Sequence, residues 1–259
     1  MRFKDLLKLG ELKSIEDLNS PLTAEIHKAI IQKKPFLKKL YLDFYNEFKK
    51  SITDLPKGDL VEIGSGSGFI KEVIPEVITT DVFNGLNIDK VFSATSMPFK
   101  EGAVSAFFLF DVLHHIIDPL AFFNEVNRCL LDHGKIIMIE PYNSPWGSFV
   151  YKNFHHEPFD TNADWEITVN GRLTGANGAL PWIIFFRDRE RFQKKFPHLK
   201  IKRLTPHTPF RYLISGGLSY KQLLPSFTYD LVKGLETMLS PLNEFLGMFV
   251  TVELEKCKE

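Results

Sequence analysis

Residues 61–68 read Val61-Glu62-Ile63-Gly64-Ser65-Gly66-Ser67-Gly68, with three glycines at alternate positions directly after a short apolar run. Glycine lets the backbone turn tightly and approach a ligand without side-chain interference. If a helix follows such a loop, the loop amides face the ligand at a helix N-terminus. The stretch therefore predicts a strand, a ligand-binding loop and the start of a helix.

Two common nucleotide-binding loops fit this stretch poorly. The dinucleotide-binding pattern needs a glycine three residues after its second glycine, and that position is Phe69. A P-loop needs a Lys and then a Ser or Thr after its last glycine, and these are missing after Gly68. The sequence thus disfavours NAD, and it disfavours a P-loop nucleotide more strongly.

Two acidic residues adjoin the loop in the predicted sheet. Asp81 ends the next apolar run, where a carboxylate is placed to accept hydrogen bonds from adjacent ribose hydroxyls. Glu62 belongs to the strand before the loop. Structural roles stay open, because Asp81 could cap a turn and Glu62 could pair with a nearby cation. Together with the glycine loop, the two acids favour a ribose-bearing cofactor.

Short apolar runs alternate with helical stretches from residue 57 onward, which is typical of strand-helix-strand units and a mostly parallel sheet. We expect strands at Leu60–Ile63, Val77–Thr80, Lys90–Phe92, Val104–Phe110, Lys135–Ile139, Lys200–Leu204 and Phe249–Leu254. We expect helices over about 67–74, 120–131, 187–196 and 227–239. Gly134 is expected to stop the second of these helices before the next strand.

Two segments stand outside this alternation. Residues 1–56 carry apolar residues at three-to-four-residue spacing, which predicts an N-terminal helical cap whose second helix starts at Pro35. Residues 142–182, after the fifth strand, are rich in Asn, Gly, Pro, Trp and His and are too long for a routine connection. We therefore expect one domain over 57–259, with the 142–182 insertion forming a substrate lid.

Four blocks in this order resemble the class I, Rossmann-like methyltransferases over residues 59–140. They are Glu62 to Gly68, Asp81, Met97-Pro98-Phe99, and Leu113-His114-His115-Ile116 with Asp118-Pro119. The Leu-His-His block is similar to that of a branch acting on small molecules. The resemblance implies a doubly wound α/β fold with a mostly parallel seven-stranded sheet, helices on both faces, and a last strand that is antiparallel.

The resemblance also implies a cofactor, S-adenosylmethionine, which leaves as S-adenosylhomocysteine. In such proteins the glycine loop lines the methionine and ribose side, the acid after the second strand holds the ribose, and residues at the Ala94 and Thr95 positions lie near adenine. The contacts implied for this chain are Glu62, Gly64, Ser65, Gly66, Gly68, Asp81, Ala94, Thr95, Asp111, Val112 and His115.

Two positions depart from the pattern of this family. Many of its members carry Asp where this chain has Ser93 and Ser105. A serine hydroxyl at Ser93 can still hydrogen-bond the adenine amine, but more weakly than a carboxylate does. These departures bear on cofactor affinity and leave the expected fold unchanged.

The insertion holds the candidate catalytic residues His155, His156 and Glu157. Ligands of open parallel sheets bind beyond the carboxyl ends of the strands, where this segment is expected. Acceptor binding, proton removal and a purely structural role remain open for the three. We expect no metal, because adjacent histidines in an extended chain point to opposite faces and no third ligand is identifiable. Trp146, Trp165 and Trp182 are expected to pack the insertion rather than to stack on an acceptor.

The composition limits the partners. The chain has 259 residues, 32 basic and 32 acidic, so no global charge attracts DNA or RNA. Residues 187–203 hold eight basic and two acidic residues, for which an exposed helix face is preferred over an anionic acceptor or a membrane surface. Cys129 and Cys257 match neither a disulfide framework nor a zinc site. With no apolar run long enough for a membrane span, we expect a soluble, cytoplasmic protein.

The sequence thus predicts an S-adenosylmethionine-dependent methyltransferase acting on a small or medium-sized acceptor, with oxygen as the preferred acceptor atom. A non-catalytic cofactor-binding or partner-binding module on the same fold is the alternative. An RNA-modifying enzyme is a third class, which the balanced charge disfavours. The sequence identifies neither the acceptor nor the oligomeric state.

Overall fold

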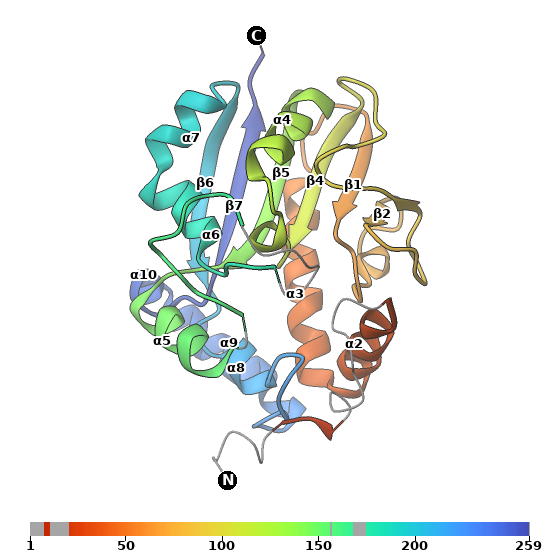
Figure 1. Cartoon of the computed structure of the whole chain (residues 1–259). Coiled ribbons are helices and arrows are strands. Elements are labelled where there is room, and N and C mark those ends of the chain that lie inside the picture. Colours follow the sequence, from red (N-terminus) through yellow and green to blue (C-terminus); the bar gives the residue numbers. More distant parts are fainter. Residues whose placement is uncertain (1–7, 11–20, 156, 168–174, 259) are drawn as a thin grey trace.

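A mixed seven-stranded sheet forms the centre of the computed structural model, which describes residues 8–10, 21–155, 157–167 and 175–258 (Figure 1). The strand order is β3-β2-β1-β4-β5-β7-β6. The strands are β1 (Asp59–Ile63), β2 (Ile78–Asp81), β3 (Lys90–Val91), β4 (Val104–Phe110), β5 (Leu130–Pro141), β6 (Leu199–His207) and β7 (Phe249–Lys256). Each overlaps a strand expected from the sequence, so the doubly wound α/β fold is confirmed.

The last strand has the direction that the family resemblance implies. Strands β1 to β5 pair in parallel with one another, whereas β7 pairs antiparallel with both β5 and β6. Strand β7 therefore lies between two strands that are parallel to each other. Strand β4 is buried along almost its whole length, which explains its nearly continuous apolar sequence.

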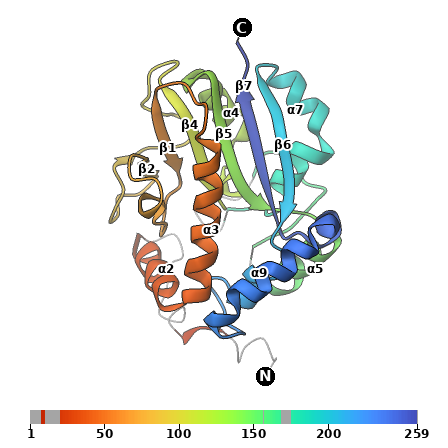
Figure 2. The same cartoon turned by 180° about the vertical axis from the view of Figure 1, so that it is seen from behind.

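Helices cover both faces of the sheet. Helix α3 (Pro35–Ser51) lies on one face (Figure 2), and α4 (Pro119–Cys129) and α7 (Arg189–Lys195) lie on the other (Figure 1). In α3, the ring of Phe48 lies 5.2 Å from that of Phe108 in β4, and the ring of Phe44 lies 5.5 Å from that of Phe249 in β7. Helix α3 thus belongs to the same core as the sheet, and the expected domain division at residue 56 stays a prediction.

The remaining helices cap the carboxyl edge of the parallel strands (Figures 1 and 2). They are α2 (Pro21–Lys33), α5 (Pro145–Phe154), α8 (Arg211–Ser215), α9 (Tyr229–Met238) and α10 (Asn243–Leu246). Buried Lys34, between α2 and α3, ties this region to the segment after α8, because its Nζ donates to the carbonyls of Gly217 at 2.6 Å and Tyr220 at 2.8 Å. In the described part of the chain, every helix is too short or too polar to cross a lipid bilayer.

The insertion 142–182 contains regular structure that its composition did not reveal. Besides α5 it holds α6 (Leu180–Trp182), which leads into the π-helix η4 (Ile183–Arg187). Helix α5 starts with a recognisable signal, since Ser144 accepts a hydrogen bond from Gly147 N at 2.8 Å and Pro145 follows the cap. The side chain of Trp165 is buried against Phe192, as expected for an anchor of the insertion.

The helix expected over 67–74 is wrong. A three-residue 3₁₀ turn, η2 (Ile70–Glu72), follows the glycine loop instead. The amide of Phe69 donates to Tyr45 Oη at 3.2 Å, and its φ of −146° is not helical. Phosphate-binding loops use the N-terminus of the helix that follows them, and a short 3₁₀ turn stands in its place here. The structure therefore disfavours a ligand bound to this loop through a phosphate group.

The expected role of Gly134 as a helix stop is also wrong. Helix α4 ends at Cys129 and β5 starts directly at Leu130, so Gly134 lies inside the strand. The register between β4 and β5 shifts there, which is the mark of a bulge. A Cβ at Gly134 would lie 2.8 Å from Leu131 O and 3.0 Å from Ser105 O. The glycine thus permits a close approach of two strands.

The short helical elements complete the architecture. They include η3 (Leu113–His115), η5 (Ser226–Thr228) and η6 (Ser240–Leu242). The first lies between β4 and α4, and the other two flank α9.

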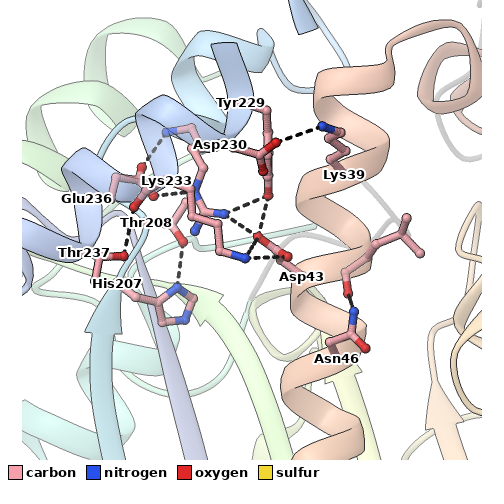
Figure 3. A network of polar contacts seen from close by, with 12 residues as sticks. Lys39, Asp43, Asn46, His207, Thr208, Tyr229, Asp230, Lys233, Glu236 and Thr237 are labelled. Carbon is pink, nitrogen blue, oxygen red and sulfur yellow. Dashed lines mark hydrogen bonds and ion pairs between the residues drawn. The ribbon is translucent and has the colours of Figure 1, made fainter. Parts of the chain in front are cut away.

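A buried ion-pair network holds α8 and α9 against α3 (Figure 3). Arg211 pairs through Nε with Glu236, and its Nη1 donates to Asp43 at 2.5 Å and to Tyr229 Oη at 2.7 Å. Lys233 also pairs with Asp43, at 2.8 Å. Arg211 and Glu236 are both buried, so each depends on the other to compensate its charge.

We expect Arg211→Met to lower the free energy of unfolding by roughly 3–5 kcal/mol, because it leaves the Glu236 carboxylate buried without its partner. Urea unfolding followed by circular dichroism measures this difference. Lys39→Met is the matched control, since Lys39 pairs with the exposed Asp230, and solvent screening should hold its effect below about 1 kcal/mol. Equal effects of the two substitutions would contradict the assignment.

Candidate active site

The glycine loop follows β1 and needs glycine for both conformation and space. Gly64 and Gly66 have φ values of +69° and +49°, in the left-handed region. A Cβ at Gly64 would lie 2.7 Å from a methyl group of Val112, and one at Gly68 would lie 2.6 Å from Tyr45 Oη. The loop is therefore packed between the turn after β4 and helix α3.

Asp81 ties the end of β2 to this loop. Its Oδ2 accepts a hydrogen bond from Gly66 N at 3.0 Å, and its Oδ1 accepts from Val82 N at 2.7 Å and Phe83 N at 3.3 Å. The side chain thus shapes the loop and the turn after its own strand, one of the roles left open by the sequence. It also lines the cavity described below, so the structural role does not preclude ligand binding.

Glu62 is buried beneath the loop with an unsatisfied oxygen. Among the described residues, its Oε2 has no hydrogen-bond partner. Burial raises the pKa of the Glu62 carboxyl from 4.5 to about 7, and the Asp81 carboxylate adds to this rise while a hydrogen bond from Ser65 opposes it. A buried polar atom without a partner favours a ligand that donates to it.

One cavity of about 1800 Å³ joins these residues to the rest of the candidate site. It is larger than the roughly 300–1,000 Å³ of most small-molecule sites. Every residue expected to contact the cofactor lines it, namely Glu62, Gly64, Ser65, Gly66, Gly68, Asp81, Ala94, Thr95, Asp111, Val112 and His115. His155 and Glu157 line it too, whereas His156 lies outside the described residues.

The two serines that depart from the family pattern lie in different surroundings. Ser93 lines the cavity, and its Oγ lies 2.8 Å from Thr95 Oγ1. Ser105 is buried in β4, where its hydroxyl donates to the carbonyl of Pro56. Of the two departures, Ser93 alone is therefore placed to affect a ligand.

A buried carboxylate, Glu140 at the end of β5, organises the turn after β4. Its Oε1 accepts hydrogen bonds from Val112 N at 2.9 Å and Leu113 N at 2.7 Å, and its Oε2 lies 2.8 Å from His114 Nδ1. The sequence did not assign Glu140 a role, and its place directly after an apolar strand was the available signal.

His114 connects Glu140 to the insertion. Its Nε2 lies 3.3 Å from Glu157 Oε2 and 3.9 Å from Asp111 Oδ1. Burial alone would lower the pKa of His114, but its hydrogen bonds to Glu140 and Glu157 hold it well above the usual value. Because one ring nitrogen of His114 faces Glu140 and the other faces Glu157, each of the two carries a proton.

Glu157 brings the insertion to the end of β4. Its carboxylate lies 3.5 Å from both His115 Nε2 and His155 Nδ1. Burial acts to raise the pKa of Glu157, yet the bond to His114 and the histidine charges around it hold the pKa well below its usual range. The structure therefore brings together two of the three residues expected from the insertion, and His114 with them.

The two remaining titratable groups have strongly shifted pKa values. Burial raises the pKa of Asp111 from 3.8 to about 7, although the neighbouring His114 acts in the opposite direction. Burial, together with the charge of His114, lowers the pKa of His115 from 6.5 to about 3. His115 is thus neutral near pH 7, and its buried Nδ1 has no hydrogen-bond partner among the described residues.

The donors of His114, His115 and Glu157 lie within 4.8 Å of one another, close enough for metal binding. Both ring nitrogens of His114, however, already contact carboxylates. A doubly protonated imidazole has no lone pair to offer a metal, so this arrangement favours an ion-pair cluster.

The acceptor half of the cavity is mainly apolar. It is lined by Val150, Tyr151 and Phe154 of α5 and by Tyr212 and Leu213 of α8. Residues 209–217 thus contribute to the cavity through the short helix α8.

Comparison with known family models gives a match over part of the chain. Residues 61–138 match a family model described as a methyltransferase domain. The match covers β1 to most of β5, with the glycine loop, Asp81 and the turn after β4. A comparison with curated protein sequences gave no match.

Solved structures with a similar fold include several methyltransferases. Phosphoethanolamine N-methyltransferase 2 from Haemonchus contortus, in complex with S-adenosyl-L-methionine, is 16% identical, with a TM-score of 0.50 over 100% of this chain and 60% of that chain. Geranyl diphosphate C-methyltransferase from Streptomyces coelicolor A3(2) is 16% identical, with a TM-score of 0.48 over 95% of this chain and 86% of that one. A putative methyltransferase complexed with the Haloferax volcanii Trm112 activator is 12% identical, with a TM-score of 0.49 over 94% and 99%.

Sheet order, loop and family match define a class I methyltransferase domain. Residues 61–138 thus carry the methyltransferase domain that the sequence predicts, and the strand order is that of the expected fold.

The raised pKa of Glu62 predicts how stability depends on pH. Because the folded state holds a proton that the unfolded state releases above pH 4.5, this group makes the free energy of unfolding fall as pH rises from 4.5 to about 7. We expect Glu62→Gln to remove this fall and to be more favourable at pH 8 than at pH 5.5, by up to about 2 kcal/mol. Urea unfolding at the two pH values measures the difference.

Glu76→Gln is the control for this prediction, because Glu76 is an exposed carboxylate in the turn before β2. Its substitution should change stability by the same small amount at both pH values. A Glu62→Gln protein whose pH dependence matches that of the wild type would show that Glu62 is ionised throughout.

Proposed function

We propose that the chain transfers a methyl group from S-adenosylmethionine to a small or medium-sized acceptor with an apolar part, and that oxygen is the acceptor atom. One observation carries the proposal: a single cavity connects the glycine loop and Asp81 with the Asp111, His115 and Glu157 cluster and with the apolar walls beyond it. The cofactor supplies the electrophilic methyl group when bound, and the protein positions the acceptor and excludes water.

The residues of the cofactor half suit this ligand. The unpartnered Glu62 Oε2 is suited to accept from the amino group of the methionine part, and Asp81 to accept from the ribose hydroxyls. Ala94 and Thr95 would flank the adenine, and Ser93 offers a hydroxyl to its amine. The glycines leave room for close contact with the loop backbone.

Asp111 is our candidate for removing a proton from the acceptor hydroxyl. A base works best when its pKa lies near the working pH, and the pKa of Asp111 is raised to about 7. Glu157 is a weaker base because its pKa is depressed. We therefore assign Glu157 and His155 to acceptor binding, with Glu157 also fixing His114 and His115.

The two alternative functions predict different behaviour. A non-catalytic module would bind the cofactor tightly without turnover on any acceptor. An RNA-modifying enzyme would bind RNA with a steep salt dependence. The basic stretch 187–203 gives the RNA alternative little support, because Arg187, Arg191, Lys202 and Arg203 pair with carboxylates.

Calorimetry with S-adenosylmethionine tests the cofactor site. We expect the wild type to bind and the double variant Gly66→Trp with Asp81→Ala to lose binding by at least about a hundredfold, since charged hydrogen bonds and steric access are both removed. Gly234→Trp with Asp230→Ala is the matched control, because both residues are exposed on α9 and a Cβ at Gly234 meets nothing within 4 Å. Unchanged affinity in the first variant, or no binding by the wild type, would refute the site.

Release of S-adenosylhomocysteine with a panel of hydroxyl-bearing acceptors tests the role of Asp111. We expect the wild-type rate to rise with pH through about 7, and Asp111→Asn to lower it roughly 10²–10⁴-fold. Glu166→Gln, at an exposed acid of the insertion, is the control. Full activity of Asp111→Asn would show that the acceptor needs no proton removal by this residue.

A further inference from the structure

Helix α9 presents its apolar residues outward. Of its three buried residues, Val232 is the apolar one, and Tyr229 and Glu236 belong to the ion-pair network that faces α3 and α8 (Figure 3). By contrast, Leu231 and Met238 are 77% and 79% exposed. A surface helix normally turns its apolar stripe to the core, so this reversed arrangement indicates that the outer side contacts something other than water.

The exposed residues of α9 continue into a longer apolar stripe. Within α9, Leu231, Leu235 and Met238 recur every three or four positions, which places them on one side of the helix, and further exposed apolar residues precede and follow it. The apolar stripe consists of Leu223, Phe227, Leu231, Leu235, Met238, Leu242 and Phe245. Phe227, at 83%, is its most exposed member. Such a contiguous exposed set marks an interaction surface.

The apolar stripe is continuous with the acceptor half of the cavity. Leu223 is 49% exposed and also lines the cavity. Phe154 at the end of α5 likewise lines the cavity and is 41% exposed, and Phe149 on the same helix is exposed as well. Leu223 and Phe154 thus belong both to the apolar wall of the cavity and to the outer surface of the protein.

We propose that the apolar stripe docks on the surface of a lipid bilayer and opens the cavity toward it, so that the methyl acceptor is an amphiphile drawn from the membrane. The substrate class rests on the proposed function, whereas the docking does not. A folded protein partner seated on the stripe would cover the rim at Leu223, whereas a bilayer both covers the apolar side chains and delivers a ligand with an apolar part.

The charges around the apolar stripe define the kind of bilayer. Asp230, Lys233 and Glu236 pair with Lys39, Asp43 and Arg211 of the protein body. Their charges are thus compensated internally, and the exposed Lys221 and Glu244 beside the stripe are opposite in sign. Insertion of leucine, methionine and phenylalanine side chains should therefore drive binding, with little dependence on lipid charge or salt.

Sedimentation with sucrose-loaded phosphatidylcholine vesicles tests the docking. We expect the wild type to bind at about 0.1 M and at about 0.5 M salt with similar partition coefficients. Leu231→Glu with Met238→Glu should lower partitioning by at least about tenfold, because two inserting side chains are replaced by charges. Both positions are exposed, so the fold should be retained.

Thr53→Glu with Asn124→Glu is the matched control, since it adds the same charge at exposed positions outside the apolar stripe and should leave partitioning unchanged. Calorimetry with S-adenosylmethionine on both double variants separates this proposal from the cofactor site, because cofactor affinity should be unaffected. Failure of the wild type to bind vesicles would overturn the docking even if it binds the cofactor. Light scattering that shows a wild-type dimer broken by the stripe variant would overturn it as well and assign the stripe to a second copy.

Discussion

The contact between the buried carboxylate of Glu140 and the ring of His114 is the constraint on which the acceptor half of the site depends. A carboxylate without exposure needs full compensation, and it obtains this from two backbone amides and one imidazolium. Those amides belong to the turn after β4, and the imidazole contacts Glu157 of the insertion. One charged group thus fixes the end of a strand, the turn beside the cofactor half and the segment that covers the acceptor half.

The cavity consequently has walls of two kinds. The cofactor wall is made of backbone turns at the ends of β1, β2 and β4, where glycines and hydrogen bonds define the shape. The acceptor wall is made of side chains on α5 and α8, which reach the site from segments far apart in sequence. The first kind suits a ligand common to a family, and the second suits a ligand particular to one protein. This explains why the family match at residues 61–138 includes the cofactor wall and not the acceptor wall.

The sequence predicted the strands well because buried parallel strands are nearly continuous apolar runs, as in Val104–Phe110. It also predicted which residues line the cofactor half. It failed for residues 67–74, since the bond from Phe69 N to Tyr45 Oη is a contact between distant segments that no local pattern records. Glu140 was overlooked for the same reason, because its partners lie 26 to 28 residues away. Helix α5 did have a local signal, at Ser144 and Pro145, which the unusual composition of the insertion obscured.

The Arg211 network connects helix α9 to the residues that line the cavity. Arg211 precedes Tyr212, a residue of the acceptor wall, and its partner Glu236 lies on α9 between the outward-facing Leu235 and Met238. A displacement of α9 is therefore transmitted to the acceptor wall through the bonds that Glu236 and Tyr229 make with Phe210 and Arg211. The network also reaches the cofactor wall, because Arg211 pairs with Asp43 of α3, and Tyr45 of the same helix accepts a hydrogen bond from Phe69 N after the glycine loop. In this fold one polar network therefore links the outward-facing helix to both walls of the cavity.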